Sequence, residues 1–136
     1  MPELRRILLV EDDLDIQIVA RIALQDLAGF ELEVCSSGYE ALEKAPKYDP
    51  DLILLDVMMP ELDGPSTLKE VRQIHSLATT PVIFVTAKAQ PEEVAEYRRL
   101  GALEVIVKPF DPMTLGDRIR DIWSQSSEAP QSAASP

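Results

Sequence analysis

Cysteine and aromatic residues are scarce in this chain of 136 residues, which has one cysteine, Cys35, and only 5% aromatic residues. A single cysteine cannot form a disulfide within the chain, and no metal-ligand partners lie near it in the sequence. A lone thiol fits a reducing compartment, so we expect a cytoplasmic protein. No apolar run approaches the roughly 20 residues that a membrane helix needs, and the apolar run near the N-terminus is too short for a signal peptide.

Positive charge is also in short supply, since 24 acidic residues outnumber 13 basic ones and the net charge is −11. Phosphate contacts need a basic face, so direct nucleic-acid binding is disfavoured, as is adhesion to an anionic membrane surface. What the chain does have is apolar content of 46%. That value, with this length, is typical of one soluble globular domain with a full hydrophobic core.

Short apolar runs alternate with helical patterns five times along the chain. The clearest run covers residues 52–55, and similar runs occupy residues 7–10, 82–85 and 105–107. Uninterrupted runs of this length are typical of strands that are buried on both faces of a parallel sheet. Residues 30–35 alternate between apolar and acidic side chains, which predicts a half-exposed edge strand. The order of elements therefore predicts an α/β sandwich with helices on both faces of a parallel sheet.

The helix predicted over residues 14–27 carries two sets of apolar side chains. One set recurs at steps of three and four residues and should form the buried face: Ile16, Val19, Ala20, Ala23, Leu24 and Leu27. On another side, Ile18 and Ile22 either contact a neighbouring helix or form an exposed docking patch.

Two further boundaries follow from turn residues and composition. A shorter helix is expected over residues 39–45, and residues 46–50 should return the chain to the next strand. From Ser124 the chain is rich in Ser, Ala, Pro and Gln. We therefore expect one folded domain over residues 1–123 and a disordered tail or linker over residues 124–136.

Polar side chains follow four of the five predicted strands: Glu11 and Asp12, Asp56, Thr86, and Lys108. The carboxyl ends of parallel strands meet at one edge of a sheet, so these side chains should converge. Three converging carboxylates repel one another unless a cation lies among them. Ligand sets made only of oxygen favour a hard cation, above all Mg²⁺.

This set of groups suits phosphoryl transfer to a carboxylate. Asp56 can attack phosphorus and form an acyl phosphate, while Mg²⁺ screens the charge between the two anions. Lys108 would bind phosphoryl oxygens as a point charge, and Thr86 would donate a hydrogen bond to another.

Four motifs carry a resemblance to a known family: residues 7–13 (ILLVEDD), 56–64 (DVMMPELDG), 85–88 (VTAK) and 107–110 (VKPF). In this order and spacing, the chain resembles the receiver domain of bacterial two-component response regulators over residues 6–123. The resemblance implies a flavodoxin-like (βα)5 fold with strand order 2-1-3-4-5. It also implies a regulatory module, not an enzyme, that accepts a phosphoryl group from a histidine kinase or phosphotransfer protein and either switches a downstream effector or relays phosphate.

The resemblance also assigns roles residue by residue. Asp56 is similar to the phosphoacceptor of the family. Asp12 corresponds to a direct Mg²⁺ ligand, Glu11 to one that acts through water, and the backbone carbonyl of Met58 to the third protein ligand. Asp13 is expected to cap the following helix.

Thr86 and Lys108 keep the roles derived above, and the bond between Lys108 and Pro109 resembles the cis peptide of the family. One position departs from the family pattern. Val105 stands where an aromatic residue usually changes rotamer with the hydroxyl residue, and a β-branched side chain cannot make that change. We therefore expect intact phosphorylation chemistry and an altered readout through the last strand and its flanking helices.

Three other functions are alternatives for such a strand-end site. A Mg²⁺-dependent phosphohydrolase with the same aspartate chemistry needs a second Asp two residues after the nucleophile, where this chain has Met58. A flavin-binding protein of similar fold needs a phosphate-binding loop after the first strand, where this chain has three acidic residues. A pseudo-receiver, which acts only as a protein-interaction domain, would not require the complete set of site residues.

Overall fold

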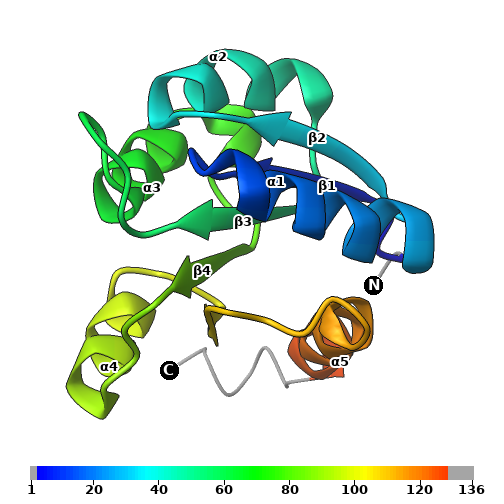
Figure 1. Ribbon diagram of the computed structural model, residues 1–136. Coiled ribbons are helices and arrows are strands. Elements are labelled where there is room, and N and C mark those ends of the chain that lie inside the picture. The colour runs from blue at the N-terminus through cyan, green and yellow to red at the C-terminus, as the bar shows by residue number, and fades with distance from the viewer. Residues whose placement is uncertain (1–2, 129–136) are drawn as a thin grey trace.

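The computed structural model describes residues 3–128 and contains a parallel sheet of five strands in the order β2-β1-β3-β4-β5 (Figure 1). This order confirms the predicted flavodoxin-like fold. The strands are β1 (Arg6–Val10), β2 (Glu31–Cys35), β3 (Leu52–Asp56), β4 (Val82–Thr86) and β5 (Glu104–Val107). The helices are α1 (Leu14–Arg21), η1 (Ile22–Leu27), α2 (Gly38–Tyr48), α3 (Gly64–Gln73), η2 (His75–Leu77), α4 (Pro91–Arg99) and α5 (Leu115–Glu128).

The sheet lies between two hydrophobic clusters because successive side chains of a strand point to opposite faces. In β4, Phe84 packs with residues of α2, α3 and α4, and its neighbour Ile83 packs with residues of α1, η1 and α5. Every residue of β3 and β4 is buried, as the uninterrupted apolar runs predict, and β2 lies at one edge of the sheet. No helix within residues 3–128 has both the length and the apolar content that a membrane span requires.

The helix predicted over residues 14–27 changes its geometry part of the way along. The α-helix ends at Arg21, and Ile22–Leu27 form a π-helix. A π turn contains an additional residue, so side chains beyond Ile22 rotate away from the 3.6-residue period. Ala20, Ala23 and Leu24 are buried as predicted, but Leu27 is 55% exposed and Val19 is 37% exposed, so the prediction was wrong at both.

The second apolar set on this helix is exposed. Ile18 is 59% and Ile22 is 44% accessible to solvent, and Leu14, one turn earlier, is 68% accessible. Contact with a neighbouring helix was therefore the wrong alternative. The three side chains lie four residues apart and form what we call the α1 stripe: Leu14, Ile18 and Ile22.

Two other helices are longer than the sequence predicted. α2 continues through Pro46 to Tyr48, because a proline in the last turn removes one backbone hydrogen bond only. Asp49 then ends the helix in the left-handed region, with φ of 56°.

α5 continues through Glu128, so Ser124–Glu128 are helical although a tail was expected to begin at Ser124. The sequence contains no proline or glycine between Gly116 and Pro130, so no helix-breaking residue intervenes. The remaining residues of the expected tail, 129–136, lie outside the described residues.

Candidate phosphoacceptor site

The carboxyl ends of four neighbouring strands bring the predicted polar residues to one edge of the sheet. Asp56 is the last residue of β3, Thr86 is the last residue of β4, and Glu11 directly follows β1. β3 pairs with β1 on one side and with β4 on the other, so these residues lie on adjacent strands. Glu11, Asp56 and Thr86 are each at most 2% exposed. Buried carboxylates require a compensating charge or hydrogen bonds.

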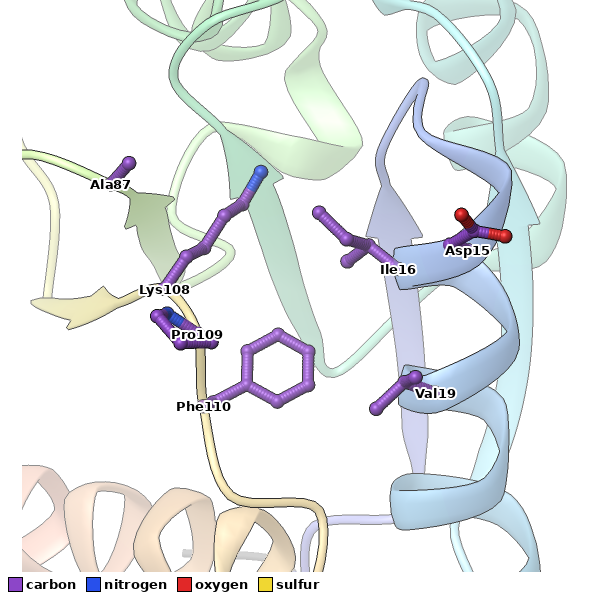
Figure 2. A pocket seen from close by; sticks show the side chains of 7 residues that line it. All are labelled: Asp15, Ile16, Val19, Ala87, Lys108, Pro109 and Phe110. Carbon is purple, nitrogen blue, oxygen red and sulfur yellow. The ribbon is translucent and has the colours of Figure 1, made fainter.

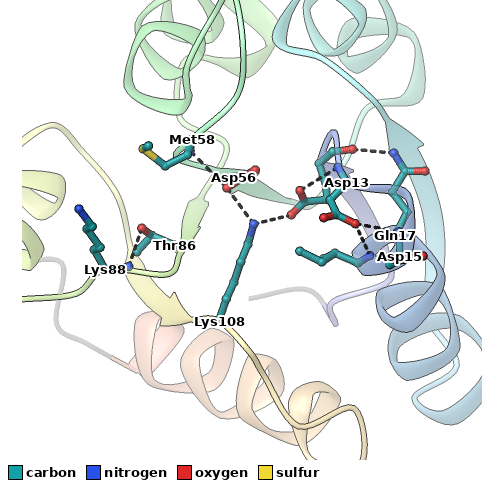
Figure 3. Close-up of polar contacts among 10 residues, drawn as sticks. Asp13, Asp15, Gln17, Asp56, Met58, Thr86, Lys88 and Lys108 are labelled. Atoms are coloured by element: carbon teal, nitrogen blue, oxygen red, sulfur yellow. Dashed lines mark hydrogen bonds and ion pairs between the residues drawn. The ribbon is translucent and has the colours of Figure 1, made fainter.

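Lys108 provides that charge from the segment that follows β5. Its Nζ lies 2.9 Å from Glu11 Oε1 and 3.1 Å from Asp56 Oδ1, so one ammonium group bridges two carboxylates (Figure 3). The lysine side chain is 16% exposed and the two carboxylates are 2–3% exposed. Lys108 therefore holds the ends of β1 and β3 together across the edge of the sheet.

Burial and this ion pair act in opposite directions on the titration of the site. Burial is the largest influence on Glu11 and raises its pKa to about 7, although the hydrogen bond from Lys108 lowers it. Burial alone would lower the pKa of Lys108, but hydrogen bonds with Glu11 and Asp56 hold it above its usual value. A carboxyl group that is costly to ionise next to a lysine that stays charged indicates a site with a deficit of positive charge.

The residues fit a divalent cation. Glu11, Asp12 and Asp56 each offer an oxygen within 4.8 Å of the others. Asp12 is exposed, whereas the other two are buried, so the cluster opens toward solvent on one side. A set of carboxylate oxygens without nitrogen or sulfur suits Mg²⁺, which retains several waters.

The loop after β3 is held close to Asp56. The Met58 amide donates a hydrogen bond to Asp56 Oδ1 at 3.3 Å, and the Gly64 amide donates one to the Val57 carbonyl at 2.9 Å. A Cβ atom at Gly64 would lie 2.5 Å from the Asp56 carbonyl oxygen, so only glycine permits this approach. Sequence reasoning identified the motif but missed this steric role, which a glycine in a turn only suggests.

Two predicted site residues have local roles in the structure. The Thr86 hydroxyl accepts a hydrogen bond from the Lys88 amide at 3.1 Å, and within residues 3–128 no hydrogen bond joins it to Asp56. The Asp13 carboxylate accepts hydrogen bonds from the Asp15 and Ile16 amides, which confirms the predicted helix cap. Gln17, which was not predicted to belong to the site, donates hydrogen bonds to the Glu11 carbonyl and to Ser36.

An apolar groove with a volume of about 340 Å³ adjoins the site. Ile16 and Val19 of α1 point toward Phe110, and the stem of Lys108, Pro109, Ala87 and Asp15 complete the lining (Figure 2). The peptide bond between Lys108 and Pro109 is cis, as the resemblance implied. Asp15 and Val19, which line the groove, directly follow Leu14 and Ile18 of the α1 stripe in the sequence.

Val105 lies inside the sheet sandwich at 5% exposure. It pairs with Phe84 of β4, whose ring makes an edge-to-face contact with Tyr97 of α4, with 5.2 Å between ring centroids. The aromatic side chain next to Val105 is therefore Phe84 of β4, and β5 supplies none at this position.

The fold and the site together define a flavodoxin-like α/β domain whose strand ends form an acidic, lysine-bridged cluster. The family model described as response regulator receiver domain matches residues 7–120. The regulatory protein AtoC of Escherichia coli is 39% identical over 111 residues, which cover 82% of this chain and 23% of that protein. The alkaline phosphatase synthesis transcriptional regulatory protein PhoP of Bacillus subtilis is 35% identical over 129 residues, which cover 95% of this chain and 52% of that protein. Among solved structures, the chemotaxis response regulator CheY4 of Vibrio cholerae has a TM-score of 0.81 and 36% identity, and the match covers 88% of this chain and 99% of that one.

The chain belongs to the response regulator receiver domains. Its function is phosphorylation-dependent two-component signalling, in which receiver domains interact with histidine kinases, and it is a regulatory domain and not an enzyme in its own right. The chain spans about a quarter of AtoC and about half of PhoP.

Proposed function

We propose that Asp56 is the phosphoacceptor of this receiver domain. A carboxylate oxygen of Asp56 attacks the phosphorus of a phosphohistidine on a histidine kinase or phosphotransfer protein. The phosphorus–nitrogen bond breaks as a phosphorus–oxygen bond forms, and its electron pair stays on the nitrogen, so an imidazole that carries a proton on its other nitrogen leaves as the neutral ring. The observation that supports this role most strongly is that Asp56 is buried at the strand edge with its Oδ1 held 3.1 Å from Lys108 Nζ.

Mg²⁺ is the cation that we propose for the cluster, with Glu11, Asp12, Asp56 and the Met58 carbonyl as its protein ligands, Asp12 directly and Glu11 through water. When bound, Mg²⁺ would screen the charge between Asp56 and the incoming phosphoryl group. Support comes from three carboxylate oxygens that lie within 4.8 Å of one another with one lysine to balance them. Lys108 would bind one phosphoryl oxygen. The Thr86 hydroxyl, which accepts a hydrogen bond from the Lys88 amide, would give up that bond and donate a hydrogen bond to a second phosphoryl oxygen.

The experiment that tests both roles is an amide NMR spectrum with Mg²⁺ before and after addition of beryllofluoride, which stands in for the phosphoryl group. We expect shifts around Asp56 in the wild type and none in Asp56→Asn. A folded wild-type protein that shows no shifts would contradict the phosphoacceptor role and favour the pseudo-receiver. Release of inorganic phosphate from a small phosphate ester would favour the phosphohydrolase.

The α1 stripe is the docking surface that we propose for the phosphodonor protein, through Ile18 and Ile22. Both side chains are exposed, and Ile18 directly precedes Val19, which lines the groove beside Lys108. Alanine at both positions should slow phosphotransfer from the cognate donor and leave phosphorylation by a small phosphodonor such as acetyl phosphate unchanged. Leu100→Ala is the matched control, because Leu100 is 46% exposed at the end of α4. Equal slowing by the control would contradict this docking surface.

Val105 is the residue that bears on how phosphorylation would be read out. We propose that a switch of the usual aromatic type is absent and that the signal leaves by another route or the phosphoryl group is passed on, because the buried valine has no ring to move. Val105→Tyr should therefore change activation-dependent binding of a downstream protein effector. Identical coupling in the variant and the wild type would show that this position does not limit the readout.

The compartment is a proposal as well. We place the domain in the cytoplasm, because its single cysteine cannot form a disulfide within the chain and so fits a reducing compartment.

A further inference from the structure

Gln17 makes three hydrogen bonds around the turn that carries the acidic residues. Its side-chain Nε2 donates to the Glu11 carbonyl at 2.6 Å (Figure 3). The same Nε2 donates to Ser36 Oγ at 3.1 Å. Its backbone amide donates to the Asp13 carbonyl at 3.0 Å. One residue of α1 therefore binds both ends of the turn from Glu11 to Asp13.

The bond to the Glu11 carbonyl orients the peptide unit that joins Glu11 to Asp12. The Glu11 amide is already fixed by the Cys35 carbonyl at 2.9 Å, which extends the pairing of β1 with β2 by one residue. The Asp12 side chain is exposed and forms no hydrogen bond or ion pair within the described part of the chain. The main chain therefore fixes the position of Asp12 Cβ, from which the carboxylate projects.

The start of α1 does not depend on the Gln17 side chain. Asp13 caps the helix by accepting hydrogen bonds from two backbone amides of its first turn. Gln17 Nε2 instead reaches out of the helix, to β1 and to the loop after β2. The Gln17 side chain therefore stabilises the acidic turn and does not help to start the helix.

We infer that Gln17 is a positioning residue that holds the Glu11–Asp12 peptide in the orientation that lets both carboxylates share one Mg²⁺ ion with Asp56. This inference rests on the proposed function. Three carboxylates repel one another before a cation binds, and exposed Asp12 is the one free to turn away. A hydrogen bond that fixes its main chain reduces the reorganisation required when the ion arrives.

Gln17→Met tests the inference, because methionine keeps the length of the side chain and removes the amide. The full chain would be titrated with Mg²⁺ by calorimetry and by amide NMR, and hydrogen exchange of the Asp12 and Asp13 amides would be measured without metal. We expect Mg²⁺ binding about 10-fold weaker than in the wild type, the lower end of what loss of an outer-shell partner costs, and faster exchange at both amides. Gln25→Met is the matched control, since Gln25 is exposed and, within residues 3–128, its side chain forms a hydrogen bond with Arg21 alone.

Each result separates this inference from the proposed function. Equal Mg²⁺ affinity in Gln17→Met and the wild type would overturn the role of Gln17 and leave the metal site in place. A wild-type protein that does not bind Mg²⁺ at millimolar concentration would overturn the proposed metal site itself. If Gln17→Met does not fold, Gln17→Asn repeats the test with an amide that is one methylene too short to reach the Glu11 carbonyl.

Discussion

Replacement of Lys108 by methionine is the sharpest test of the electrostatics of this site. The substitution keeps an unbranched side chain of similar length and removes the ammonium group that lies 2.9 Å from Glu11 and 3.1 Å from Asp56. Without metal, two buried carboxylates then face each other with no cation between them. The variant should therefore be less stable than the wild type, by an amount that depends on pH.

The size of the loss follows from burial and from the titration of Glu11. Removal of one partner of a buried ion pair costs about 3–5 kcal/mol, and all three side chains are at most 16% exposed, so solvent screens them little. The pKa of Glu11 is raised from 4.5 to about 7 in the folded wild type. Because folding favours the protonated form of Glu11, its contribution to the free energy of unfolding is present in full below about pH 4.5. That contribution is lost as the pH rises through about 7.

The variant should continue to lose stability above pH 7, because burial raises the pKa of Glu11 further once Lys108 is absent. At pH 8 the solution is about one pH unit above the pKa of Glu11 in the wild type. Ionisation of Glu11 then lowers the free energy of the folded wild type by about 1.4 kcal/mol relative to its protonated form. The variant lacks this contribution because its Glu11 stays protonated. We therefore expect a loss of about 3 kcal/mol at pH 8 and about 1.4 kcal/mol less at pH 6.

Urea unfolding in the presence of a chelator, followed by circular dichroism at pH 6 and pH 8, measures both values. Lys88→Met is the matched control, because Lys88 is exposed near the same edge and forms no ion pair within residues 3–128. A loss that is equal at the two pH values, or no loss at all, would refute the reasoning. Addition of Mg²⁺ should reduce the difference in stability between the wild type and Lys108→Met, since the bound ion replaces the missing positive charge.

Three other outcomes are expected. Gly64→Ala should destabilise the protein by about 1–3 kcal/mol and weaken Mg²⁺ binding, because its Cβ would lie 2.5 Å from the Asp56 carbonyl oxygen. Gly116→Ala is the control: its Cβ would meet another side chain far from the site, so it should lower stability in urea and leave Mg²⁺ affinity unchanged. The Cys35 thiol, whose pKa is raised to about 12 by burial, should react with iodoacetamide at pH 8 only as the protein unfolds, and rapid labelling of the native state would contradict its burial. The pKa of Glu40 is lowered, mainly by a hydrogen bond from the backbone amide of the β2–α2 turn. Its contribution to the free energy of unfolding is therefore present above the unfolded pKa of 4.5 and lost as the pH falls through the lower folded value. In urea unfolding, the stability difference between wild type and Glu40→Gln should shrink between pH 7 and pH 3.

The sequence alone was sufficient for the strands, for the fold class and for the set of polar residues at the strand ends. Buried parallel strands appear as uninterrupted apolar runs, and a carboxylate at the end of such a run has few places to lie. The position of Asp56 and the buried character of its strand are local properties, and both follow from a few adjacent residues. The cap at Asp13 was predictable for the same reason.

Helix boundaries and exposed faces were less predictable. Periodicity assumes 3.6 residues per turn, so it misplaced Leu27 once the chain entered a π-helix. Composition placed the end of α5 too early, because Ser and Gln permit a helix without demanding one. Exposure of Ile18 and Ile22 was undecided until the packing of the neighbouring helices was known.

The contacts that complete the site were decided by tertiary structure alone. Lys108 meets Asp56 across 52 positions of sequence, and Gln17 meets Ser36 across 19. Such contacts depend on strand order, on register and on the path of the loops, which no local period encodes. The amino-acid sequence therefore determined which chemical groups reach this edge of the sheet, and the tertiary structure decided which of them touch, because distances between separate segments arise only when the whole domain packs.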